Sequence, residues 1–111
     1  MKRSERNNAY IEAINTTGVR FQNDIAIEEM SELTKALIKN NRGKNNVDEI
    51  SEEIADVMIM LETLMLVYKI SPKVINKLID EKIKYMLSIM EKKKNNQILS
   101  VFSSHEQNRQ K

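Results

Sequence analysis

This chain of 111 residues contains two glycines and one proline, and the scarcity of these two residue types limits what it can fold into. β-Sheets need frequent turns, whereas a few long helices do not. Gly18, Gly43 and Pro72 separate long segments whose apolar residues recur at helical spacing. The sequence therefore predicts an all-α fold, an antiparallel helical bundle of about four helices.

The expected helices cover residues 4–16, 20–39, 47–69 and about 71–93. Ser4 is a candidate N-cap for the first helix. Asn46 can cap the third, with Glu49 in the position that completes a capping box. Ser71 and Pro72 suit the cap and the first helical position of the fourth.

The chain is long enough for one modest domain, which we place at residues 1–93. Residues 94–111 are rich in Asn, Gln, Ser and Lys and are expected to form a polar, mobile tail or a weakly docked segment. Its one apolar patch consists of Ile98, Leu99, Val101 and Phe102. Because a single core of this size is marginal, we expect apolar surface to be buried between subunits, so that dimerisation completes the bundle.

Composition excludes several classes of function. The chain has no cysteine, which rules out thiolate metal sites and a cysteine nucleophile, and its single histidine, His105, lies in the polar tail. No apolar run approaches the ~20 residues of a membrane span, and the first residues lack the apolar core of a signal peptide. We expect a cytoplasmic protein without a membrane partner.

Four carboxylates form the most informative motif. Glu29 and Glu32 are spaced i, i+3 on the second predicted helix, and Glu53 and Asp56 repeat this spacing on the third. At about 100° per residue, Glu29 falls inside the apolar face of its helix, and the other three border the apolar stripes. Carboxylates are rarely placed there unless something positive binds them.

A single helical glutamate usually lies on a solvated face or in an intrahelical ion pair, and Glu32 could pair in this way with a nearby lysine, Lys35 or Lys39. Two acid pairs on adjacent antiparallel helices favour a different interpretation. Converging carboxylates repel one another, and a hard divalent cation such as Mg²⁺, with Mn²⁺ as an alternative, relieves this repulsion. A di-iron site is disfavoured because its Glu-x-x-His motif is missing.

The pattern EExxE, a gap, then ExxD is similar to the signature of the MazG-like all-α nucleoside triphosphate pyrophosphohydrolases. Here it reads EEMSE at residues 28–32 and EIAD at residues 53–56, and the resemblance extends over residues 18–90. It implies cleavage of a nucleoside triphosphate to the monophosphate and pyrophosphate, in nucleotide-pool housekeeping. It also implies a homodimer or homotetramer, with Mg²⁺ held by Glu29, Glu32, Glu53 and Asp56.

Two further side chains are candidates for contacting the nucleotide. Lys82 falls in the middle of the apolar face of the fourth predicted helix, where it could grip a phosphate or extend to solvent. Gln22 lies on the face that carries Glu29, and could contact substrate or fill a buried polar gap. A non-catalytic helical oligomerisation or adaptor module is the main alternative function. A nucleic-acid-binding helper is less favoured, because the basic excess is confined to residues 91–111.

Overall fold

A computed structural model describes the backbone of residues 1–109 and the side chains of residues 1–101. Four helices, α1 (Arg3–Thr17), α2 (Val19–Asn41), α3 (Val47–Val67) and α4 (Pro72–Arg109), account for nearly all of this part of the chain, and it contains no strand. The predicted all-α class is therefore confirmed. The chain divides into two units, Met1–Ser71 with the first three helices and residues 72–111 with α4.

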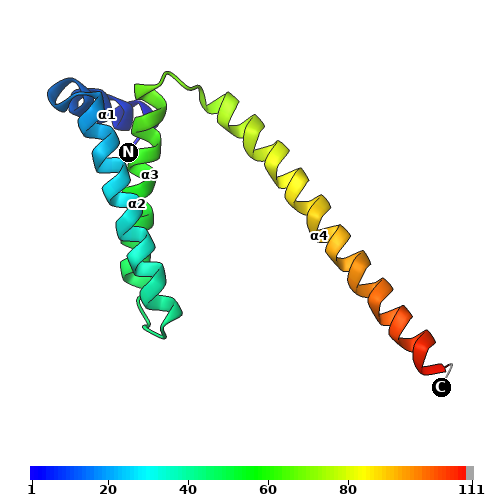
Figure 1. Cartoon of the computed structure of the whole chain (residues 1–111). Coiled ribbons are helices and arrows are strands. Elements are labelled where there is room, and N and C mark those ends of the chain that lie inside the picture. The colour runs from blue at the N-terminus through cyan, green and yellow to red at the C-terminus, as the bar shows by residue number, and fades with distance from the viewer. Residues whose placement is uncertain (110–111) are drawn as a thin grey trace. The chain divides into compact units, whose positions relative to one another are not determined.

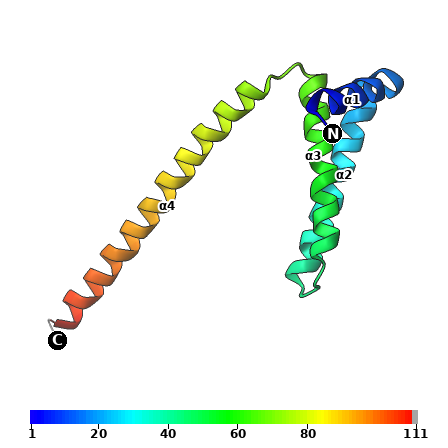
Figure 2. The same ribbon diagram turned by 180° about the vertical axis from the view of Figure 1, so that it is seen from behind.

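The first unit is built on an antiparallel pair of helices. α2 and α3 run side by side in both views, and α1 packs against them near the start of α2 and the end of α3 (Figures 1 and 2). Gly18 alone separates α1 from α2, and its φ of 86° lies in the region that favours glycine. The backbone can therefore change direction at Gly18, and the next helix begins directly after it.

The core between α2 and α3 is small. The most buried apolar residues are Ala26 and Ala36 of α2, Met60 of α3 and Tyr10 of α1. Alanines let the two helix backbones approach closely. Much of the predicted apolar stripes is nevertheless exposed in the single chain, including Met30, Leu37, Ile54 and Leu61.

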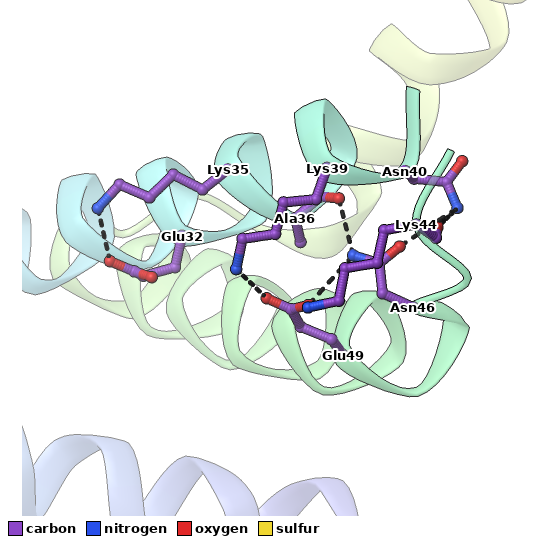
Figure 3. A network of polar contacts seen from close by, with 8 residues as sticks. All are labelled: Glu32, Lys35, Ala36, Lys39, Asn40, Lys44, Asn46 and Glu49. Carbon is purple, nitrogen blue, oxygen red and sulfur yellow. Dashed lines mark hydrogen bonds and ion pairs between the residues drawn. The ribbon is translucent and has the colours of Figure 1, made fainter. Parts of the chain in front are cut away.

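The loop end of the α2–α3 pair is joined by the buried side chain of Asn46 (Figure 3). Its Nδ2 atom donates to the carbonyl oxygen of Ala36 at 3.0 Å and to Glu49 Oε2 at 3.1 Å, while its Oδ1 atom accepts from Asn40 at 3.3 Å. Asn46 occupies the predicted N-cap position but makes no side-chain capping bond. The predicted capping box is wrong because this amide is used to bridge two helices.

Two helix ends change how their residues are interpreted, while the other boundaries lie within about two residues of the prediction. α1 begins at Arg3 with Lys2 as its N-cap, so Ser4 lies inside the helix instead of capping it. α4 begins at Pro72, as predicted, but continues to Arg109 instead of ending near Lys93. No glycine or proline follows Pro72, and polar residues such as Lys, Glu and Gln are good helix formers even without an apolar stripe.

α4 carries large apolar side chains that are exposed within the single chain. Those between residues 74 and 90 include Val74, Leu78, Ile79, Ile83, Tyr85, Met86, Leu87, Ile89 and Met90. The predicted apolar patch continues with exposed Ile98, Leu99 and Val101, while its last member, Phe102, and His105 lie outside the described side chains. None of the described helices combines the length and apolar character needed to cross a bilayer.

Candidate metal site

Three of the four predicted carboxylates meet between α2 and α3. Glu29, Glu53 and Asp56 each offer an oxygen atom, and these atoms lie within 4.8 Å of one another. Glu29 and Glu53 are half-buried and Asp56 is exposed, so the cluster opens to solvent on one side. A cluster of this kind can supply oxygen ligands to a hard cation such as Mg²⁺, which usually keeps several waters.

Helical spacing and interhelical register together build the cluster. Glu53 and Asp56 are three residues apart, which places them on neighbouring turns of one side of α3. Glu29 reaches them from α2, so its position depends on how the two helices are aligned along their length. The hydrogen bonds of Asn46 to Ala36 and Asn40 of α2 fix that alignment at the loop end.

The electrostatics of the cluster show an excess of negative charge. Burial raises the pKa of Glu29, and nearby Asp56 and Glu53 raise it further. Burial likewise raises the pKa of Glu53, with Asp56 and Glu32 adding to the effect. In both residues the charged form is disfavoured first by burial and then by neighbours that are themselves acids.

Glu53 also has an oxygen without a hydrogen-bond partner. Among the described side chains that are not exposed, its Oε2 atom is the one buried polar atom that lacks a partner. Burying an acceptor atom without a hydrogen-bond partner costs free energy, and the cost is larger when the group is ionised. The donor set, the excess charge and this orphaned oxygen all fit a divalent cation held by Glu29, Glu53 and Asp56.

The fourth predicted acid, Glu32, is engaged elsewhere. It accepts a hydrogen bond from Lys35 at 3.2 Å, in an ion pair on the surface of α2. This is the intrahelical pairing that the sequence left open, although Glu32 is close enough to raise the pKa of Glu53. The outer acids Glu28 and Glu52 are exposed.

The two predicted substrate contacts are placed differently. Gln22 is buried, and its Nε2 atom donates to Thr17 Oγ1 at 2.8 Å, which matches the alternative of a filled polar gap at the α1–α2 junction. Lys82 lies on α4, where its side chain is exposed. α4 belongs to the second unit, and the acidic cluster lies in the first.

A second polar cluster, which sequence reasoning did not identify, joins α1 to α3. The carboxylate of Glu62 accepts hydrogen bonds from the Tyr10 hydroxyl, from Arg3 and, at 3.4 Å, from Arg6. The hydrogen bond from Tyr10 lowers the pKa of Glu62, and the two arginines add to this effect. The sequence signal for this cluster is Glu62, a single acid within the largely apolar run from Val57 to Val67.

Searches against protein-family profiles, curated proteins and solved structures found no match.

Proposed function

We propose that this chain is a Mg²⁺-dependent nucleoside triphosphate pyrophosphohydrolase, which cleaves a nucleotide to its monophosphate and pyrophosphate. The observation that carries the proposal is the convergence of Glu29, Glu53 and Asp56, together with the unpaired buried oxygen of Glu53. The similarity of the two acid motifs to the MazG-like family supplies the reaction. The same acids hold the metal in that family.

The protein side chains supply positioning and charge. Glu29, Glu53 and Asp56 hold the ion, and Glu32 can join them if its exposed side chain releases Lys35. Bound Mg²⁺ neutralises phosphate charge and lowers the pKa of a coordinated water. Phosphoryl transfer needs little more than such positioning and electrostatic stabilisation.

Further roles in the proposed reaction are a proton acceptor, a phosphate contact and a support of the site. One of the motif acids, or the neighbouring exposed acid Glu28 or Glu52, accepts the proton of the attacking water. Lys82 binds a phosphate group, and Gln22 supports the site through the α1–α2 junction.

The proposed enzyme is a homodimer or homotetramer. The apolar side chains exposed on α2, α3 and α4 support an oligomer, because large apolar surfaces on soluble proteins are usually covered.

Replacing Glu53 by Gln tests the proposal. The change keeps the shape of the side chain and removes the charge, so Mg²⁺-dependent pyrophosphate release should fall at least about 100-fold, since even outer-shell partners of metal ligands are worth ~10–100-fold. Asp24→Asn, an exposed acid of the same helix as Glu29, is the matched control and should keep wild-type activity. A panel of ribo- and deoxynucleoside triphosphates, each with and without Mg²⁺, supplies the substrate.

The expected readouts separate loss of function from loss of fold. Glu53→Gln should retain its helical circular dichroism, and its melting temperature should no longer respond to Mg²⁺. Activity of this variant at the wild-type level would remove Glu53 from the site. Failure of the wild-type chain to release pyrophosphate from any nucleotide would overturn the proposed reaction.

The alternative, a non-catalytic oligomerisation or adaptor module, is favoured by one observation. α4 presents a long series of exposed apolar side chains, from Val74 to Val101, that a partner helix could cover. This alternative predicts a stable oligomer that binds no Mg²⁺ in calorimetry. Tight Mg²⁺ binding that depends on Glu53 would exclude it.

A further inference from the structure

A pocket lies between α1 and α3, on a different face of α3 from the acidic cluster, which lies between α2 and α3. Its volume is about 370 Å³, within the range of small-molecule sites. Ala9 and Tyr10 of α1 line it, facing Ala55, Met58 and Ile59 of α3. These side chains make apolar walls of a kind suited to the two faces of a flat ring.

The charged side chains that line the pocket are those of Arg6 and Glu62. The Glu62 carboxylate is fixed by Tyr10 and Arg3, and its side chain is 13% exposed. A carboxylate offers about four acceptor positions, so three donors leave one for a ligand. Within the described part of the chain, Glu62 is the one hydrogen-bond acceptor of the Arg6 side chain, whose half-exposed guanidinium has five N–H donors.

The pocket and the acidic cluster share one turn of α3. Ile59 follows Asp56 by three residues, so the two side chains are neighbours on the surface of α3, whereas Ala55 directly precedes Asp56 and lies on another side of the helix. A molecule with phosphates at the acids and a flat ring in the pocket would therefore lie across this turn. A nucleotide has that form.

We propose that the α1–α3 pocket binds the base of the nucleotide and selects a 6-oxopurine, guanine or hypoxanthine, through Arg6 and Glu62. The inference rests on the proposed nucleotide chemistry of the acidic cluster. An arginine fork matches the adjacent O6 and N7 acceptors of such a base. The neighbouring N1–H of the same ring edge is a donor for the remaining acceptor position of Glu62.

The chemistry predicts which bases are rejected. Adenine carries an amino group at position 6 and an acceptor at N1, so it turns a donor toward Arg6 and an acceptor toward Glu62. A bidentate arginine contact discriminates against the wrong base by about 5- to 150-fold. Inosine, which keeps O6, N7 and N1–H, should therefore bind about as well as guanosine and clearly better than adenosine.

Nucleosides test the pocket without phosphate or metal. Inosine, guanosine and adenosine are titrated into the full chain in EDTA, with the Met58 methyl resonance followed by NMR. Arg6→Gln and Arg6→Lys should both lose the preference for inosine over adenosine, because lysine keeps the charge and lacks the planar fork. Arg20→Gln replaces an exposed arginine of α2 that does not line the pocket, and it should keep the preference.

Three results would overturn the inference: adenosine binding as tightly as inosine, an unchanged preference in both Arg6 variants, or a Met58 methyl that does not respond. Pyrophosphate release separates this inference from the proposed function. Inosine selectivity without hydrolysis of any triphosphate supports the pocket and refutes the enzyme. Equal hydrolysis of ATP and ITP by the wild-type chain supports the enzyme and refutes the pocket.

Discussion

Replacing Asn46 by Ala tests whether the register of α2 and α3 depends on one buried amide. The substitution removes the donor to the Ala36 carbonyl and to Glu49, and the acceptor for Asn40. Asn46 is 6% exposed, so water cannot easily replace these bonds. Glu29 should then lose its fixed position opposite Glu53, because the two residues are carried by different helices.

The cost can be worked from these three bonds. A neutral hydrogen bond contributes about 0.5–1.5 kcal/mol and one to a charged group about 1.5–3 kcal/mol. The Asn40 contact at 3.3 Å is long, and Glu49 keeps its ion pair with Lys39 at 3.0 Å. We therefore expect Asn46→Ala to lower the free energy of unfolding by about 2–4 kcal/mol and the melting temperature by about 10–25 °C.

Urea unfolding followed by circular dichroism measures this difference. Asn45→Ala, at the exposed neighbouring position, is the matched control and should change the free energy of unfolding by less than about 0.5 kcal/mol.

Asn46→Asp distinguishes a bridge from a cap. Aspartate is a good N-cap but cannot donate to the Ala36 carbonyl, and it adds a charge beside Glu49. It should therefore destabilise the protein about as much as alanine does. If Asn46→Asp were as stable as wild type, or if Asn46→Ala matched Asn45→Ala, the bridging role would be refuted.

Three further predictions follow from the site and its surroundings. Burial and neighbouring acids raise the pKa of Glu53 in the folded protein, so the metal-free protein should gain thermal stability as the pH falls from 7 toward 4.5. Below pH 4.5 thermal stability should fall again, because the hydrogen bond from Lys39 lowers the pKa of Glu49 in the folded protein. Melting curves should show a smaller gain for Glu53→Gln, and an equal gain would contradict the cause. Gln22→Ala should lower the free energy of unfolding by about 0.5–1.5 kcal/mol in urea titrations, since it removes one neutral hydrogen bond while the Thr17 hydroxyl keeps its bond to the Ala13 carbonyl; a raised KM at unchanged stability would instead assign Gln22 to the substrate. Lys35→Met breaks an exposed ion pair worth at most about 1 kcal/mol and frees Glu32, so calorimetry should show Mg²⁺ binding that is unchanged or tighter, and weaker binding would argue against Glu32 as a ligand.

Sequence reasoning predicted the helices well because their signals are local. The scarcity of glycine and proline and the periodic apolar residues were sufficient to place the starts of α2, α3 and α4 within about one residue. The predicted end of α4 near Lys93 is wrong because the apolar stripe ends at Met90, whereas the helix itself continues to Arg109. Helix propensity continues through Lys92 and beyond, since no residue there opposes it.

Side-chain bonds between helices were harder to predict, because their partners are distant in sequence. Asn46 was correctly placed at the start of α3, yet its amide bonds Ala36 of the preceding helix. The bonds that join Glu62 to Tyr10 and Arg3 span more than 50 residues and have no repeat to reveal them. Periodicity determines which face a residue occupies, and it does not determine what lies opposite.

The same distinction explains why three of the four predicted acids meet and the fourth does not. Glu29, Glu53 and Asp56 lie at the seam between α2 and α3, and their oxygen atoms converge there although Asp56 is exposed. Glu32 lies at the outer edge of its helix face and is 44% exposed, so a lysine three residues away can reach it. The i, i+3 spacing is equal in both pairs, and the difference lies in the neighbours on the same helix: Glu32 has Lys35 three residues away, whereas no lysine or arginine stands within four residues of the other three acids. A divalent ion bound by Glu29, Glu53 and Asp56 would also attract Glu32, in competition with Lys35. The partner of Glu32 should therefore change when the ion binds, whereas the Oε2 atom of Glu53 has no other partner to give up.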